Sequence, residues 1–153
     1  MSAEARLAEL GIALPPASTP LASYVMARRG GNLVHCSGHL GKRDGVPVVG
    51  AVGGDVSRED AQAAARAAAI EILATLRQLL GSLDAVESVV KVTGFVRSAA
   101  SFTEQPFVVN GASDLFVEVF EEQGHHARSA VGVAQLPLGA AVEIEAIVQV
   151  STA

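Results

Sequence analysis

The segment Ala141–Val150 reads Ala-Val-Glu-Ile-Glu-Ala-Ile-Val-Gln-Val, and it is the stretch that determines the type of fold. Its residues alternate with the period of two that is typical of a β-strand. One face of that strand carries five apolar side chains, namely Val142, Ile144, Ala146, Val148 and Val150. The other face carries Glu143, Glu145, Ile147 and Gln149. The pattern predicts a strand in a sheet that has one covered face.

Two more strands are predicted upstream of this segment, with a helix between them. Pro137-Leu138-Gly139 separates the last strand from a strand over Ser129–Leu136. A further strand covers Val89–Arg97, where Val90, Val92 and Val96 are expected on the covered side, opposite Lys91, Thr93 and Arg97. The intervening helix has Thr103 as its expected cap and Pro106 in its first turn, and it ends before Gly124.

A long helix is predicted between Ser57 and Gly81. Ser57-Arg58-Glu59-Asp60 is close to a capping box, and Gly81 favours a left-handed stop. Before it, Leu33–Ser37 forms a short strand, and Asp44-Gly45 predicts a hairpin turn into a return strand at Val46–Val49. Pro47 restricts that return strand to an edge or a bulge.

The N-terminal residues 1–20 form a separate lead-in to a single domain over residues 21–153. Ala3–Leu10 has helical spacing that stops at Gly11, and Pro15, Pro16 and Pro20 prevent its continuation. The order strands, helix, strand, helix, strands predicts an α+β fold with two main helices on one face of a mixed sheet. The opposite face mixes charged and apolar residues, which favours an interface between subunits.

Composition excludes several classes of function. The 153 residues are 50% hydrophobic and 18% charged, so the chain is expected to fold rather than to stay disordered. A net charge of −5 and 4% aromatic residues disfavour nucleic-acid binding. Glu4 and Glu9 interrupt the N-terminal apolar pattern, so no signal peptide is expected. No stretch approaches about 20 consecutive apolar residues, so no membrane span is expected. With one cysteine, a reducing cytoplasmic location is the expectation.

Few residues could carry chemistry on their own. The adjacent His125 and His126 would need a third metal ligand from elsewhere, so a turn pair with one hydrogen-bonded ring is preferred to a metal site. Cys36 could be a nucleophile with His35 or His39 as its base, but a cysteine in an apolar strand is usually an inert core residue. Tyr24 could close the core where the chain enters it, or it could have a functional role.

Arg128 is the most informative candidate. It opens a strand, where its guanidinium could bind a small carboxylate through two hydrogen bonds. The alternative is a structural salt bridge to Glu143 or Glu145. The residues alone favour neither interpretation.

The stretch Arg128–Pro137, Arg-Ser-Ala-Val-Gly-Val-Ala-Gln-Leu-Pro, followed by Val142–Ile147, resembles the C-terminal signature of the RidA/YjgF family. Some members of that family carry the labels endoribonuclease L-PSP or chorismate-mutase-like. The resemblance covers roughly Tyr24 to Val150, which leaves the N-terminal helix as an addition. It implies a homotrimer with a central barrel-like core of sheets, outer helices and three clefts between subunits.

The resemblance also implies an activity and a site. The deaminase branch hydrolyses reactive 2-imino acids such as 2-aminoacrylate to 2-keto acids and ammonia, without a metal or an organic cofactor. By position, Arg128 and the backbone amide of Ala130 would bind the substrate carboxylate, and Glu143 would activate water. A carboxylate beside Arg128 is expected to stay ionised. The remaining pocket positions are Gly38, which offers its carbonyl, together with Tyr24 and Asn110.

Two residues and the length of one segment depart from the family pattern. Ala130 replaces a cysteine or a small polar residue, His39 replaces a glutamine and is expected near the mouth of the cleft, and the span Asn110–Arg128 is one residue longer. Two other functions stay open. The protein could hold a small carboxylate metabolite without catalysis, or act as an endoribonuclease as the family label says, which its acidic charge disfavours.

Overall fold

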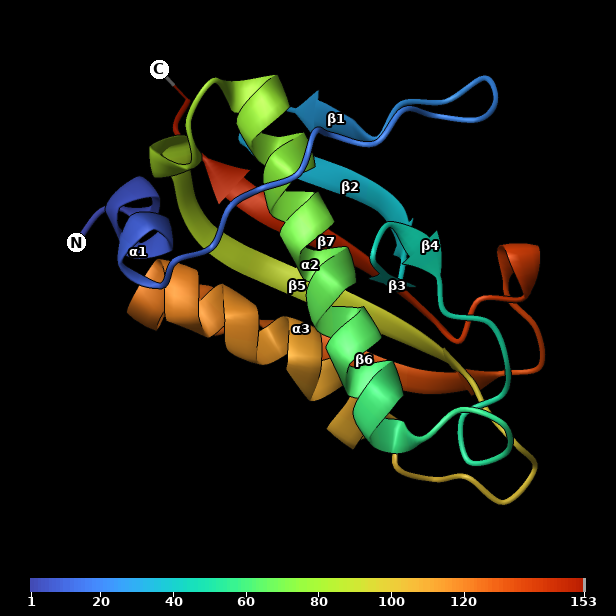
Figure 1. The fold of residues 1–153 in the computed structure, drawn as a ribbon. Helices are drawn as coiled ribbons and strands as arrows, with labels where there is room; N and C mark the ends of the chain where they lie inside the picture. The colour runs from blue at the N-terminus through green and yellow to red at the C-terminus, as the bar shows by residue number, and fades with distance from the viewer. Residues whose placement is uncertain (153) are drawn as a thin grey trace.

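The computed structural model describes residues 1–152 and shows a five-stranded sheet covered on one face by two long helices (Figure 1). This confirms the predicted α+β class. The helices are α1 (Ala3–Glu9), α2 (Arg58–Leu80) and α3 (Gln105–Phe120). The strands are β1 (Ala27–Gly30), β2 (Leu33–Leu40), β3 (Lys42–Arg43), β4 (Val46–Pro47), β5 (Val86–Arg97), β6 (Ala127–Val133) and β7 (Val142–Val150). Short 3-10 turns lie at Leu83–Ala85, Glu121–Gly124 and Pro137–Gly139.

The strands lie in the order β1-β2-β7-β5-β6, so the C-terminal strand lies in the middle of the sheet. Every neighbouring pair is antiparallel except β5 and β6, which are parallel and are joined by α3. Strands β3 and β4 form a separate small hairpin around Asp44 and Gly45, both with positive φ. All five apolar residues of the predicted face of β7 are buried, which confirms the alternation.

The ends of the long helices follow local sequence signals, with one exception. The Ser57 hydroxyl accepts from the amide of Asp60, and Gly81 ends α2 with a φ of 84°. Helix α3 begins at Gln105, so the prediction that Thr103 caps it is wrong. Glu104 occupies the cap position without a side-chain hydrogen bond. Pro106 is the second residue of the helix, where its restricted φ and missing amide donor are tolerated.

A bulge in β5 changes which valine enters the core. The register against β7 shifts between Val89 and Lys91, so Val89 is buried while Val90 is 38% exposed. The prediction that Val90 lies on the covered side is therefore wrong. One extra residue in the strand reverses the alternation at that point, and Val92 and Val96 are buried as predicted.

A second bulge, in β2, turns His39 into the core. The register against β7 shifts between Cys36 and His39, so both side chains face inward. His39 is 2% exposed, with Nδ1 2.6 Å from the Ser37 carbonyl and Nε2 2.9 Å from the Thr75 hydroxyl on α2. His39 contributes to the lining of a pocket of about 610 Å³, as a residue near a cleft would, but its ring is buried and does not lie at an open cleft mouth as expected.

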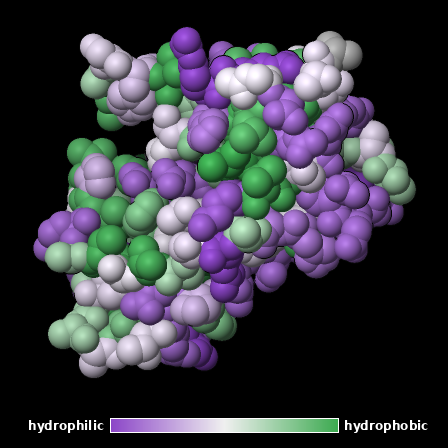
Figure 2. Space-filling model, turned by 180° about the vertical axis from the view of Figure 1, so that it is seen from behind, coloured by the Kyte–Doolittle hydropathy of each residue, from purple (hydrophilic) through white to green (hydrophobic). Residues whose placement is uncertain are grey.

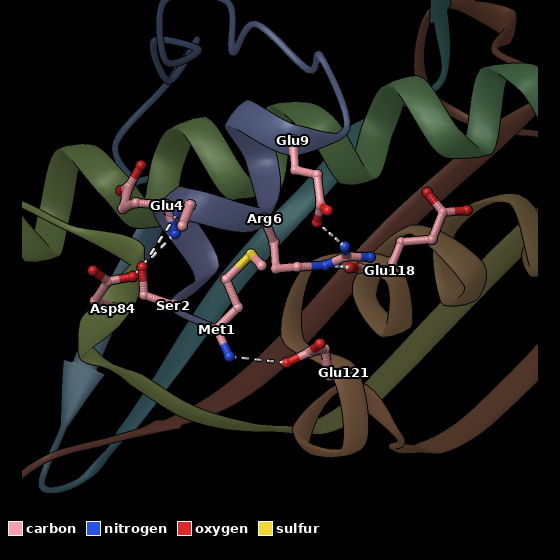
Figure 3. Close-up of polar contacts among 9 residues, drawn as sticks. Met1, Ser2, Glu4, Arg6, Glu9, Asp84, Glu118 and Glu121 are labelled. Atoms are coloured by element: carbon pink, nitrogen blue, oxygen red, sulfur yellow. Dashed lines mark hydrogen bonds and ion pairs between the residues drawn. The ribbon is translucent and has the colours of Figure 1, made fainter.

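Helix α1 packs against the rest of the fold and adds Leu7 to the hydrophobic core. Figure 3 shows Arg6 reaching toward α3, where its Nε donates to the Glu118 carbonyl at 3.0 Å. The carboxylate of Glu4 pairs with Arg77 on α2 and accepts from the Leu83 amide at 2.9 Å. From α1 the chain crosses α2 to β1, as Figure 1 shows.

The other face of the sheet carries no helix among residues 1–152, and Figure 2 shows it as a mixture of apolar and polar side chains. A hollow of about 250 Å³ on this face is lined by Lys91, Thr93, Glu145 and Ile147, among others. Val131 on β6 is 42% exposed. Within residues 1–152, no helix combines the length and the apolar character needed to cross a membrane.

The close contact between α2 and α3 can be tested by substitution of Gly111. A Cβ added at Gly111 of α3 would lie 2.1 Å from the backbone oxygen of Gln62 on α2. Gly111→Ala should therefore push the helices apart, at a cost that exceeds the about 1 kcal/mol gained in helix propensity. We expect a net loss of roughly 1–3 kcal/mol in the free energy of unfolding, measured in urea.

Gly30→Ala is the matched control, because nothing lies within 4 Å of an added Cβ at that position. Equal stability of the Gly111→Ala and Gly30→Ala variants would contradict the close packing of α2 and α3.

Burial of His39 should make the stability of the protein depend on pH. Burial disfavours the imidazolium and lowers the pKa of His39 in the folded chain. Below about pH 6.5, the unfolded state then binds more protons than the native state, so the free energy of unfolding decreases as the pH falls. We expect lower stability at pH 5.5 than at pH 7.5, and a smaller decline in His39→Gln, measured by urea unfolding.

His125→Gln serves as the control, since His125 is exposed. The same decline in both variants would show that His39 does not contribute to the pH dependence of stability.

Candidate functional site

The predicted site residues fall into two groups at different places in the fold. Tyr24, Gly38 and Glu143 line one pocket of about 610 Å³. Arg128 lies elsewhere, at the edge strand β6, where it meets Asn110 of α3. Ala130 follows Arg128 on the same strand. We call the first group the Glu143 pocket and the second the Arg128 edge.

The Glu143 pocket is formed by β2, β7 and the chain segment that precedes β1. A Cβ at residue 38 would lie 2.7 Å from Cδ of Glu143, so a side chain there would displace the carboxyl group from its place against β2. Tyr24 is 48% exposed and lines the same pocket. The ion pair between Lys42 and Glu71, 3.0 Å long, contributes charged atoms to the wall. Most of the remaining lining is apolar: Pro16, Ala17, Leu21, Met26, Leu40, Pro47, Pro137 and Leu138.

The environment of Glu143 favours its protonated form. Burial raises the pKa of this carboxyl group above its ordinary value, and the like charge of Glu145 raises it further. The expectation that Arg128 keeps it ionised does not hold within one chain, because Arg128 is not beside it. A carboxylate with a raised pKa is a better proton acceptor at neutral pH than an ordinary glutamate.

Arg128 is anchored by neutral oxygen atoms of α3. Its Nη1 donates to Oδ1 of Asn110 at 2.7 Å and lies 3.3 Å from the hydroxyl of Ser113. The alternative of a salt bridge to Glu143 or Glu145 is therefore wrong. Among residues 1–152, Nε and Nη2 of Arg128 have no hydrogen-bond partner, so one edge of the guanidinium is free to bind a ligand.

Ser113 was not among the predicted site residues. It lies three residues after Asn110, on the same face of α3, and this i, i+3 spacing is the signal that could have indicated it. A depression of about 530 Å³ opens beside this part of the edge, lined by Ser113, His126 and Arg128, among others. Ala130 pairs with Gly94 and packs against the core.

One chain does not bring Arg128 and Glu143 together. Arg128 pairs with Val92 and points to the helical side of the sheet, whereas Glu143 pairs with Phe95 and lies on the open side. Strand β5 lies between β6 and β7, so Arg128 and Glu143 are about 10 Å apart across the sheet. Their partners on β5, Val92 and Phe95, are three residues apart, which adds about 10 Å along the strand direction.

The other candidates behave as structural residues. Cys36 is 5% exposed, and burial raises the pKa of its thiol to about 12, so it is not a thiolate at neutral pH. His126 has both ring nitrogens in hydrogen bonds, as the turn interpretation predicts. Within the described residues 1–152, no three His, Cys, Asp or Glu side chains are grouped to hold a metal ion.

Comparisons with known proteins match the whole fold. The chain is 50% identical to Protein TCP17 of Trypanosoma cruzi, over 96% of this chain and 93% of that protein. It is 33% identical to the 2-iminobutanoate/2-iminopropanoate deaminase of Dermatophagoides farinae, over 90% and 93% of the two chains. The crystal structure of Atu1372 from Agrobacterium tumefaciens, described as a protein with unknown function, superimposes with a TM-score of 0.89. That pair is 46% identical over 97% of this chain and 92% of the other.

The sequence profile named Endoribonuclease L-PSP matches residues 15–150. The match includes every predicted site residue and confirms the resemblance found in the C-terminal signature. The chain therefore belongs to the endoribonuclease L-PSP family, which is the RidA/YjgF family.

Proposed function

We propose that this protein is a hydrolytic deaminase of 2-imino acids whose active site forms between two copies of the chain in a homotrimer. Arg128 of one copy binds the substrate carboxylate, and Glu143 of its neighbour activates the water. The observation that carries the proposal is the anchored Arg128, whose charge is held by neutral partners and whose Nε and Nη2 edge is free.

The Arg128 edge suits a small carboxylate. A guanidinium binds a carboxylate best through two parallel hydrogen bonds, and Asn110 and Ser113 occupy only Nη1. Strand β6 is at the edge of the sheet, so backbone groups near Ala130 are available to the same carboxylate. This arrangement supports the binding role that the family resemblance assigns to these residues.

The Glu143 pocket supports the chemical step. Glu143 accepts a proton from water as the water oxygen adds to the carbon of the protonated imine, and the C=N bond becomes a C–N single bond in a tetrahedral carbinolamine. Glu143 returns this proton to the nitrogen and then takes up the proton of the carbinolamine hydroxyl as the C–N bond breaks, so that ammonia leaves and the 2-keto acid forms. The Gly38 carbonyl orients the attacking water or the nitrogen, and Tyr24 lines the pocket beside them.

A site formed by two subunits would account for the separation of the two groups in one chain and for the apolar residues on the open face of the sheet. The two groups lie on opposite sides of the sheet, so a complete site requires a second copy. The open face of the sheet presents apolar residues, including Val131 and Ile147, that contact with neighbouring copies would bury. A trimer places three such sites between neighbouring subunits.

The named activity of the Dermatophagoides farinae relative supports this proposal at 33% identity. The endoribonuclease label of the family is less compatible with this chain, because a net charge of −5 repels a phosphate backbone. Binding of a carboxylate without catalysis would use the same Arg128 edge and is distinguished by the experiment below.

The test measures keto-acid and ammonia release from imines that an amino-acid oxidase generates in situ, with the side chain of the precursor varied. Wild type should accelerate release, and Arg128→Ala should lose roughly 100-fold in kcat/KM, because two charge-assisted hydrogen bonds disappear.

Arg43→Ala is the control, since Arg43 forms a surface ion pair with Asp60 outside both groups. Full activity in Arg128→Ala would contradict the proposed role. Carboxylate binding without acceleration by wild type would instead indicate a binding protein.

A further inference from the structure

A chain of hydrogen bonds leads away from Arg128 into the protein. The hydroxyl of Ser113 lies 3.3 Å from Nη1 of Arg128 and 2.9 Å from Nε2 of His126. Nδ1 of His126 lies 2.7 Å from the carbonyl oxygen of Gly124. Four groups from α3, β6 and the turn before β6 are therefore connected in one line.

The two end groups determine which atom donates in each hydrogen bond, because the Gly124 carbonyl only accepts and the Arg128 guanidinium only donates. A carbonyl oxygen only accepts, so Nδ1 of His126 carries the hydrogen that it donates to Gly124. In the neutral ring Nε2 is then an acceptor, and it takes the hydroxyl hydrogen of Ser113. The lone pairs of Ser113 are left for Arg128, which only donates.

We propose that His126 is a positioning residue for Arg128, acting through Ser113. With Nδ1 protonated, the ring orients the Ser113 hydroxyl so that its oxygen accepts from Nη1, and the Nε and Nη2 edge stays free for a carboxylate. This inference rests on the proposed role of Arg128 in binding the substrate carboxylate.

The protein holds the His126 ring in place by packing. The ring lies edge-on to Phe116, with centroids 6.1 Å apart and an interplanar angle of 87°. Gly124 is buried beside it, where an added Cβ would lie 2.3 Å from the backbone oxygen of Phe116. The carbonyl that fixes the ring is thus itself held tightly against α3.

The surroundings also favour the neutral ring that this arrangement needs. Burial lowers the pKa of His126, and the nearby charges of Arg128 and His125 lower it further, against the opposing effect of the Gly124 hydrogen bond. Asp114 and Glu118 line the same depression from α3. A protonated ring would instead donate to Ser113 and compete with Arg128 for its oxygen.

The first test is the tautomer of His126, read from long-range ¹H–¹⁵N correlations of the full-length protein at pH 7.5. We expect the hydrogen on Nδ1 and none on Nε2, whose lone pair accepts from Ser113. A hydrogen on Nε2 would overturn the inference, because the ring would then not accept from Ser113.

The second test measures the dissociation constant for pyruvate, a stable 2-keto acid, by calorimetry. Ser113→Ala removes the hydroxyl, and His126→Phe keeps a ring against Phe116 but removes both nitrogens. Each should weaken pyruvate binding roughly fivefold to tenfold, the effect of one lost hydrogen bond. Ser113→Thr keeps the hydroxyl and should restore binding, and in the imine assay the loss should appear in KM more than in kcat.

Arg43→Ala is the control, because its ion pair with Asp60 lies outside the connected groups and leaves them intact. If Arg128→Ala weakens pyruvate binding but Ser113→Ala and His126→Phe do not, the positioning role of His126 is overturned and the carboxylate site is not. Unchanged binding in Arg128→Ala itself would refute the proposed carboxylate site and this inference together.

Discussion

The alternation of β7 is the constraint on which the rest of the structure depends. Its apolar residues pack beneath α2 in the hydrophobic core, and the same period of two places Glu143 on the opposite face. Arg128 lies two strands away and points to the helical side. A chain that buries its core in this way cannot bring both groups to one site. The fold thus requires a second copy for any reaction that uses Arg128 and Glu143 together.

Charge placement in the two groups is complementary. Arg128 is held by neutral acceptors rather than by a carboxylate, so its charge is not neutralised within the chain. Glu143 lies against Gly38 in a pocket that raises its pKa, with no cation among its direct partners in residues 1–152. One group is suited to binding an anion and the other to accepting a proton, which are the two tasks that the proposed imine hydrolysis requires.

Much of the fold could be predicted because local signals specify it. The Ser57 cap, the Gly81 stop and the alternation of β7 depend on near neighbours in the sequence. The bulges that expose Val90 and bury His39 could not be predicted, because each is set by the register of a partner strand distant in sequence. The signature around Arg128 indicated the candidate site. Its anchoring by Ser113 depends on how α3 packs beside β6, which the sequence pattern does not contain.

Shared assembly of the site can be tested most directly by complementation. Arg128→Ala and Glu143→Gln each inactivate a different half of the site, so each variant alone should be inactive. When the two are unfolded and refolded together in equal amounts, about a quarter of the interfaces between subunits should combine two intact halves. We expect the mixture to recover about a quarter of the wild-type rate of imine hydrolysis. No recovery, despite mixed oligomers demonstrated by mass spectrometry, would contradict shared assembly of the site.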